Sequence, residues 1–367
     1  MNREIMQANK MLLEQSMEKH KKVYSGDKDI IVTAHGWNNG YYASPLAMYN
    51  SMEEEFKTQI LAYNANCEAH LNGFDNIPTI RIVAGCATWT MAMAYGCEMV
   101  ISDDRIAVKH MIDDVQDAFN VKKPDKIYEH GVYPKITERI LEFQRRYGDI
   151  MISASDNQSP NDILTEVVNS EEAMCAMYSD PEPIHYLLNL FTQSDIELNK
   201  FQQSIIKNYG GHQPGAYLPF GIFLADDNAS FLSPETYNEF DRPYNEILAK
   251  EFGGVGLHCC MKYEQNLKNM SETEGFLLFD PQTDFNNIDI IADSLKGKNA
   301  VWNLNNAPWQ KNKDRGYSDE QMLKNAIDRI GGKNGIIVNA YGETKDEAFK
   351  LAASIKEYAL KKVGSNL

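Results

Sequence analysis

The sequence has little positive charge and no long apolar run, and each absence excludes a class of protein. Lysine and arginine together number 36 against 52 aspartates and glutamates, which gives a net charge of −16. Nucleic acids and anionic membrane surfaces are bound through concentrated positive charge, so neither is expected as a partner. No stretch approaches the roughly 18 consecutive apolar residues of a membrane span, and the polar N-terminus lacks the apolar core of a signal peptide. These absences predict a cytoplasmic protein.

Cysteine and glycine-rich motifs are also scarce. Four of the six cysteines are isolated, and only Cys259 and Cys260 are adjacent. This pattern does not suggest a disulfide framework, so in a reducing compartment the cysteines are thiols or metal ligands. No G-x-G-x-x-G motif follows the first predicted strand and no Walker loop is present, which weakens the prediction of a nucleotide-binding sheet.

What the sequence does contain is an alternation of short apolar segments with helical segments. Strands are predicted at 29–34, 78–85, 149–155, within 215–227, and at 254–258, 275–279, 299–304 and 335–340. Helices are predicted at 1–24, 45–70, 133–148, 181–207, 319–330 and 345–363. The strands lack clear alternation of apolar and polar residues, which is typical of parallel strands buried on both faces. About eight strand–helix units in this α/β chain predict a (β/α)8 TIM barrel.

We expect two parts in the chain. Residues 1–75 are predicted to form an N-terminal helical extension packed on the barrel, and residues 76–367 the barrel itself. Such an extension also allows a homodimer, although no motif requires one.

Polar residues stand where the predicted strands end. In a TIM barrel the carboxyl ends of the strands meet around one rim, which carries the active site. Asp and Asn are common in loops, so a single position indicates little, whereas the accumulation around one rim favours a site. The predicted catalytic residues are Asp156, Asp226, Asp227 and Asp280. The predicted substrate-binding residues are Trp302, Asn305, Asn339 and Tyr341.

The segment GVGLHCC (254–260) ends a predicted strand with one histidine and two cysteines. Residues i and i+2 of a strand point to the same face, so His258 and Cys260 can converge on one target while Cys259 points away. Imidazole nitrogen and thiolate sulfur are ligands of zinc. A reactive thiol and an ordinary buried pair remain open alternatives at this level, because a lone His-x-Cys is a weak signal.

Several segments together resemble the uroporphyrinogen decarboxylase superfamily. The segment ADDNASFLSPETYNEFDRPYNEIL, followed by a strand and HCC, is similar to its Asp-rich strand end, Ser-Pro-Glu helix start and His-x-Cys motif. SDPEPIHYLLNLFTQSDIELNKFQ resembles its Asp-Pro-Glu helix, and SDNQSPNDIL its Gly-Pro loop, with Ser159 at the glycine position. The resemblance covers roughly residues 90–360 and implies a (β/α)8 barrel.

The resemblance implies two chemistries. One branch contains zinc methyltransferases that move a methyl group between a corrinoid (cobalamin) protein and a thiol or folate, using His-x-Cys and a later cysteine. His258 and Cys260 match the first two ligands, but no cysteine follows Cys260. Candidates for the third ligand are Asp226, Asp227, Tyr341, Cys67, Cys86 and Cys97. A corrinoid-binding protein is the partner, and zinc and cobalamin the cofactors, that this branch implies.

The other branch decarboxylates a porphyrinogen held by arginines. Its N-terminal Arg-Gln-Ala-Gly-Arg-Tyr segment is missing, and no arginine occurs between Arg3 and Arg81. Because bidentate arginine is the usual receptor of carboxylates, the methyltransferase interpretation is favoured over decarboxylation of a tetrapyrrole or other carboxylate substrate. A non-catalytic corrinoid or tetrapyrrole binder is the third alternative.

Overall fold

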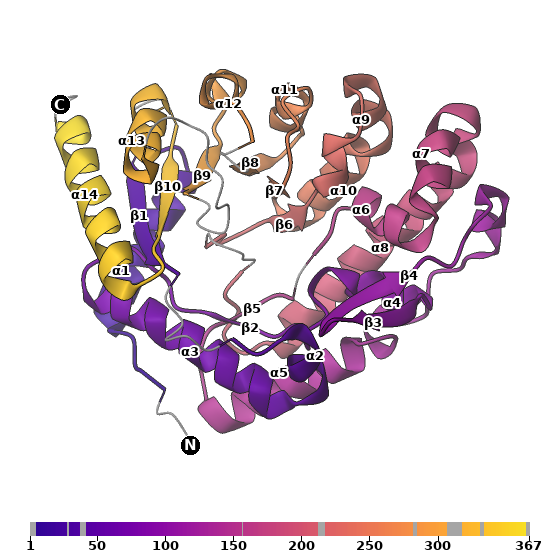
Figure 1. Cartoon of the computed structure of the whole chain (residues 1–367), viewed down its shortest axis with the longest axis horizontal. Coiled ribbons are helices and arrows are strands. Elements are labelled where there is room, and N and C mark those ends of the chain that lie inside the picture. Colours follow the sequence, from indigo (N-terminus) through magenta and orange to yellow (C-terminus); the bar gives the residue numbers. More distant parts are fainter. Residues whose placement is uncertain are drawn as a thin grey trace.

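The predicted (β/α)8 barrel is confirmed: eight parallel strands lie inside a ring of helices (Figure 1). The computed structural model describes residues 5–27, 29–36, 42–155, 157–211, 217–281, 285–306, 318–330 and 334–364. The barrel strands are β1 (Ile30–His35), β2 (Ile80–Arg81), β5 (Ile152–Ser153), β6 (Ile222–Ala225), β7 (Val255–Cys259), β8 (Phe276–Pro281), β9 (Val301–Asn305) and β10 (Ile336–Tyr341).

Six of the strands form one parallel sheet and two form another. The large sheet has the order β1-β10-β9-β8-β7-β6, and the small one pairs β2 with β5. On one side, Ser159 N donates to the Ala225 carbonyl at 2.6 Å, which links the segment after β5 to β6. On the other side, Asp75 and Asn76 form backbone and side-chain hydrogen bonds with Val32 and Ala34 of β1. These contacts close the barrel between the two sheets.

Helices cover the outside of the strands. They are α1 (Lys10–Tyr24), α2 (Pro45–Asn50), α3 (Met52–Leu71), α4 (Thr90–Tyr95), α5 (Tyr133–Tyr147), α6 (Pro160–Val167), α7 (Ser170–Ser179), α8 (Pro181–Ile205), α9 (Pro234–Phe240), α10 (Arg242–Phe252), α11 (Leu267–Ser271), α12 (Ile288–Leu295), α13 (Asp319–Ile330) and α14 (Lys345–Gly364). Short 3-10 helices are η1 (Ala87–Trp89), η2 (Val115–Asn120), η3 (Ile127–Glu129) and η4 (Asp227–Ser230).

Serine caps set several of these helix starts. Ser44, Ser159 and Ser233 each precede a proline and accept a hydrogen bond from a backbone N–H of the first turn of α2, α6 and α9. Such a cap satisfies a donor that the helix leaves unpaired, and proline fits the first helical position. The helix predicted at 45–70 is divided at Ser51, because this residue leaves the helical conformation and its side chain caps α3 through Glu54 N.

An antiparallel hairpin lies outside the barrel between α4 and α5. It consists of β3 (Glu98–Ser102) and β4 (Arg105–Lys109), and the sequence analysis did not predict it. Asp103 and Asp104 form its turn with φ values of 48° and 62°, the left-handed pair that a tight two-residue hairpin requires. Aspartate tolerates this conformation less readily than glycine, so the turn lacks the usual sequence signal.

The N-terminal segment closes the bottom of the barrel. Val23 and Tyr24, at the end of α1, pack on five inward residues of the strands: Ile31, Phe223, Leu278, Val301 and Ile337. β1 belongs to the large sheet although it lies before residue 76, and the division of the chain into 1–75 and 76–367 stays a prediction.

Among the described residues, no helix combines the length and the apolar character that crossing a membrane requires.

Candidate metal centre

Alternation along the strands decides which side chains reach the barrel interior. Phe223 and Leu278 face inward, onto the apolar layer closed by α1. Their neighbours Leu224 and Phe279 belong to the core between strands and helices. Because residues two apart share a face, Asp280 lies on the inward face above Leu278, and His258 on the inward face of β7.

The two adjacent cysteines at the end of β7, Cys259 in the strand and Cys260 directly after it, have opposite environments. Cys260 is exposed, while Cys259 is fully buried with Sγ 3.7 Å from the Asp227 carbonyl oxygen. Burial raises the pKa of the Cys259 thiol. His258 Nε2 lies 2.9 Å from Cys260 Sγ, as the predicted convergence of these two side chains requires.

Asp280 of β8 orients the His258 ring. Its Oδ2 lies 2.8 Å from His258 Nδ1, and its side chain is 6% exposed. A carboxylate that accepts the Nδ1 proton fixes the ring with Nε2 toward Cys260, where a metal ion takes the place of a proton in many metal-binding histidines. Burial lowers the pKa of His258, but Asp280 and then Cys260 raise it, and the net result is well above its usual range.

Asp227 enters the site from the start of η4. Its Oδ1 accepts a hydrogen bond from Cys260 N at 2.6 Å, which joins η4 to the end of β7. The backbone of Asp227 is held from α6: Asp162 Oδ2 accepts from Asp227 N at 2.9 Å, and Oδ1 accepts from Asn228 N at 2.8 Å. Asp162 is buried and was not singled out by the sequence analysis.

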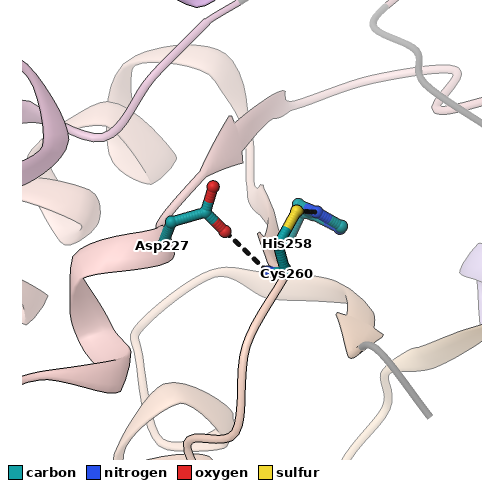
Figure 2. Close-up of side chains that lie close together, drawn as sticks. All are labelled: Asp227, His258 and Cys260. Carbon is teal, nitrogen blue, oxygen red and sulfur yellow. Dashed lines mark hydrogen bonds between the residues drawn. The ribbon is translucent and has the colours of Figure 1, made fainter. Parts of the chain in front are cut away.

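Asp227, His258 and Cys260 together form a donor set for a metal ion. One ligand atom from each residue lies within 4.8 Å of the others, and no other such group of His, Cys, Asp and Glu occurs in the described part of the chain. Figure 2 shows the three side chains gathered at the end of β7. Ligands of tetrahedral zinc lie roughly 3.3–3.8 Å apart at the usual bond lengths, so small side-chain shifts adapt this set to the ion. The residues therefore fit a zinc site.

Asp226 points away from this donor set. It is fully buried, and its Oδ2 accepts weakly from Tyr237 of α9 and Asn245 of α10, both at 3.4 Å. Burial and the neighbouring Asp241 raise the pKa of Asp226 well above its usual range, and burial raises that of Asp241 to about 7. This carboxyl pair retains a proton at neutral pH on the helix side of β6.

The remaining predicted residues are distributed over both faces. Asn339 faces the interior, where its Nδ2 donates to Asn303 Oδ1 at 2.6 Å, and Tyr341 follows it on the same face of β10. Asn305, half-buried at the end of β9, pairs in register with Asn339. Trp302 is fully buried in the core between strands and helices. Asp156 lies outside the described residues.

The three upstream cysteines proposed as third ligands lie elsewhere. Cys67, Cys86 and Cys97 are buried, and Cys86 and Cys97 point their thiols at the carbonyls of Ala84 and Glu166. Of the residues considered for the third position, the geometry brings Asp227 to His258 and Cys260.

Two inward residues of β1 were missed by the sequence analysis. Thr33 and His35 face the interior, where Thr33 Oγ1 lies 2.7 Å from Asn339 Oδ1 and 2.9 Å from His35 Nε2. The only available signal was the polar end of the strand IIVTAH, since a histidine at a strand exit resembles His258 in position.

Comparisons with known proteins give a family, a partly matched relative and a shared fold. The family model described as "Uroporphyrinogen decarboxylase (URO-D)" matches residues 63–301. A "Methylated-thiol--coenzyme M methyltransferase" of Methanosarcina mazei is 30% identical over 144 residues, which are 38% of this chain and 36% of that protein. The chain thus matches about a third of that relative's length. The solved structure of a "methyltransferase from Methanosarcina mazei" has a TM-score of 0.67 and 17% identity, covering 94% of this chain and 98% of its own. This structural likeness shows a shared fold.

Proposed function

The chain belongs to the uroporphyrinogen decarboxylase family, and from this premise we propose that it is a zinc-assisted methyltransferase. One observation carries the proposal: Asp227, His258 and Cys260 present ligand atoms within 4.8 Å of one another at the mouth of the barrel. The partly covered relative whose printed name is a methylated-thiol methyltransferase supports the same reaction class.

His258 Nε2, Cys260 Sγ and an Asp227 carboxylate oxygen would hold the zinc ion. Asp227 takes the place of the later cysteine that the resemblance implies and that this chain lacks. Three protein ligands leave a fourth position open, as in catalytic zinc sites. When bound there, zinc supplies Lewis-acid chemistry that keeps a thiol ligand in its thiolate form near neutral pH.

The protein's own residues prepare this site. Asp280 holds the Nδ1 proton of His258 and so keeps Nε2 available as a ligand. Asp227 Oδ1 holds Cys260 N, which leaves the other carboxylate oxygen for the metal. In the metal-free protein, His258 Nε2 and Cys260 Sγ share a hydrogen bond of 2.9 Å, which holds the two ligand atoms together. The inward side chains Asn305, Asn339 and Tyr341 stay the proposed substrate contacts.

The proposed substrates are a methylated corrinoid and a thiol or folate acceptor, with a corrinoid-binding protein as the methyl carrier. A methyl group passes between carrier and acceptor, so both must reach the mouth of one barrel. Burial raises the pKa of Asp226 and Asp241, which lie together on the other side of β6, away from this mouth. That arrangement offers no direct contact between Asp226 and a substrate near Cys260.

Metal analysis of purified variants tests the proposal. Wild type is expected to carry about one zinc per chain after exposure to zinc and desalting, and His258→Ala, Cys260→Ala and Asp227→Ala are expected to carry much less. Cys259→Ala is the matched control, because the neighbouring thiol is buried and faces away. Equal, negligible zinc in all five proteins would remove the metal from the proposed function.

Methyl transfer is tested separately by following the loss of the methylcobalamin absorption when a thiol is added. The zinc-loaded wild type is expected to demethylate the cofactor, and Cys260→Ala is expected to be at least tenfold slower. A protein that binds cobalamin without demethylating it with any thiol or folate would support the non-catalytic alternative. Activity of Cys260→Ala on a carboxylate substrate that Asp226→Asn abolishes would support the metal-free decarboxylase.

A further inference from the structure

A chain of hydrogen bonds runs through the barrel interior and ends at His35. Asn339 Nδ2 donates to Asn303 Oδ1 at 2.6 Å, and Thr33 Oγ1 lies 2.7 Å from Asn339 Oδ1. His35 Nε2 lies 2.9 Å from Thr33 Oγ1. Thr33, Asn303 and Asn339 are buried, whereas His35 is half-buried as the last residue of β1. These hydrogen bonds connect the buried interior of the barrel to one residue at its mouth.

The direction of these bonds fixes the tautomer of His35. Because Asn339 offers an oxygen to Thr33, the single hydroxyl proton of Thr33 is donated to Asn339 Oδ1. A more distant acceptor, the Val338 carbonyl at 3.4 Å, would use the same proton. Thr33 Oγ1 must then accept from His35, so Nε2 carries the proton and Nδ1 carries a lone pair.

The surroundings of His35 keep the ring neutral and in place. Burial lowers the pKa of His35 to about 4, against the smaller opposing effect of Asn339. The ring stacks on Tyr341, with centroids 5.1 Å apart and an interplanar angle of 29°. Within the described residues, Nδ1 has no hydrogen-bond partner, and it is not among the buried polar atoms left without one. Nδ1 therefore keeps an unused lone pair on a half-buried ring at the end of β1.

His35 lies at the same end of the barrel as the candidate metal centre. Its register partner is Tyr341, the last residue of β10, and all strands of the large sheet are parallel. The metal donors come from η4, which follows the edge strand β6, and from the end of β7 beside it, whereas His35 comes from β1 at the opposite edge of that sheet. A small molecule in the mouth thus meets donor ligands on one wall and the His35–Tyr341 pair on another.

We propose that His35 forms a second binding subsite, in which Nδ1 accepts a hydrogen bond from a neutral donor of the substrate, such as a thiol, hydroxyl or amide group. The subsite distinguishes hydrogen-bond donors from acceptors. A carboxylate or phosphate is itself an acceptor and meets the lone pair unfavourably, and protonating the ring to receive it works against burial. The assignment deepens the proposed function. A thiol that receives the methyl group, or a polar substituent on it, can donate the hydrogen bond to Nδ1. The subsite rests on the proposed methyltransferase function only for the identity of the substrate.

The tautomer is tested by NMR of the zinc-free chain labelled with 15N-histidine. The expected spectrum shows a protonated Nε2 and an unprotonated Nδ1 for His35, assigned by the loss of its signals in His35→Phe. Thr33→Val removes the acceptor of Nε2 while keeping a side chain of the same shape, so a mixture of tautomers is expected. A wild-type His35 with its proton on Nδ1 overturns the proposal.

The ligand class is tested with two small probes on the same zinc-free protein. The first is 2-mercaptoethanol; the second is 2-methoxyethyl methyl sulfide, in which both donors are methylated. We expect 2-mercaptoethanol to shift the Nδ1 resonance and the methylated probe to leave it unchanged. Ligand-observed NMR is expected to show binding weakened about 2- to 12-fold in His35→Phe, the range of one net hydrogen bond.

Two further variants make the outcome clear. His185→Phe is the matched control, because His185 also stacks on an aromatic ring, Phe240, but lies in α8; it is expected to bind 2-mercaptoethanol as wild type does. Thr33→Val is expected to weaken the binding of 2-mercaptoethanol, and it replaces His35→Phe in the test if that variant does not fold. Equal shifts from both probes, or unchanged binding in His35→Phe and Thr33→Val, overturn the subsite. No methyl donor or zinc is present, so failure of methyl transfer would not affect these results.

Discussion

At the scale of single residues, the site depends on the alternation of a strand. Cys259 and Cys260 are neighbours, yet one is sealed in the core and the other is exposed beside His258. A sequence shows the spacing of such residues, but it does not show which of them lie on the inward face of the strand. The prediction that His258 and Cys260 converge rested on period-two geometry, which holds wherever the chain is extended.

The two thiols are expected to differ in their reaction with iodoacetamide. Cys260 is exposed, whereas burial of Cys259 both blocks access and raises the pKa of its thiol. In the folded, zinc-free protein, Cys260 is expected to be alkylated and Cys259 to remain unmodified, as measured by peptide mass spectrometry. Zinc is expected to protect Cys260 but not the exposed Cys175. Alkylation of both neighbours at one rate would contradict the strand geometry.

Pairs of acidic residues show the limit of prediction from sequence at this scale. Asp226 and Asp227 are adjacent and equally plausible as ligands in the sequence, but Asp226 faces α9 and α10 while Asp227 faces Cys260. The chain turns into η4 at this point, and the exact strand end decides which carboxylate enters the site. Sequence-based strand boundaries are not known to one residue, so this choice required the structure.

At the scale of elements, the connection between α6 and η4 determines where Asp227 lies. Asp162, in the first turn of α6, accepts two consecutive backbone N–H groups of η4. Asn228 adds side-chain bonds to the Asn161 carbonyl and to Thr165 Oγ1. A 3-10 helix of four residues has little stability of its own, so these contacts fix its orientation.

Asp162→Asn is expected to weaken zinc binding about 10- to 100-fold, the usual effect of losing a residue that orients a metal ligand. The amide retains one acceptor but presents an N–H group to a backbone donor of η4. Zinc affinity is measured by competition with a chromophoric chelator. Asp195→Asn is the control, because it makes the same change at a buried carboxylate in α8. The explanation fails if both variants bind zinc as tightly as wild type.

The docking of α1 is expected to depend on pH through His20. This side chain is buried, its Nε2 lies 3.0 Å from the Asp75 carbonyl, and burial lowers its pKa to about 4. The unfolded chain, with a histidine pKa near 6.5, takes up the proton first. The stabilisation is therefore complete above about pH 6.5 and is lost as the pH falls toward 4, by on the order of 3 kcal/mol.

Urea unfolding at pH values between 4 and 7 measures this dependence. His20→Gln keeps a donor for the Asp75 carbonyl but cannot titrate, so the loss of stability on acidification is expected to be smaller than in wild type. It is not abolished, because the pKa of His35 is also lowered to about 4. His130→Gln serves as the control at an exposed position. An unchanged pH dependence in His20→Gln would contradict the role of His20.

The elements themselves were largely predictable, and their interruptions were not. Apolar segments and Ser-Pro caps located the strands and several helix starts, because these signals are local. The break at Ser51 comes from an extended N-cap inside an otherwise helical pattern, and the hairpin turn at Asp103 and Asp104 needs the left-handed conformation that aspartate adopts less readily than glycine. The turn also accepts a hydrogen bond from Leu46 N at the Asp104 carbonyl, a contact between distant segments that the sequence pattern does not contain.

At the scale of the whole molecule, the site assembles segments that are distant in the chain. Asp227 follows β6, and His258 and Asp280 lie near the ends of β7 and β8, whereas Thr33 and His35 come from the first strand. The barrel prediction was sufficient to place the strand ends on one rim, since parallel strands in a closed sheet permit only this arrangement. The hydrogen-bond chain from Asn303 to His35 could not be predicted, because it depends on the register of β1 against β10.

A buried ion pair joins the outer layer to the barrel. Arg139 of α5 and Glu55 of α3 are 4% and 0% exposed, with Nη1 and Oε2 2.8 Å apart. Glu55 Oε1 accepts from Val83 N and Ala84 N, after β2, where Ala84 has a left-handed φ of 49°. Arg139 also donates to the Met48 carbonyl of α2. The ion pair between α5 and α3 thus also contacts α2 and the strained segment that follows β2.

Arg139→Met is expected to lower the free energy of unfolding by about 3–5 kcal/mol, because it leaves the Glu55 carboxylate buried without its counter-charge. Adding Glu55→Gln should recover part of this loss: the amide oxygen still accepts from Val83 N or Ala84 N, and no buried charge remains. Urea unfolding measures both variants. Lys361→Met, which removes an exposed ion pair with Glu357, is the control and is expected to leave the unfolding midpoint unchanged. If Arg139→Met shifts the midpoint no more than Lys361→Met does, the pair does not stabilise the barrel, and the strained exit of β2 must be held by packing alone.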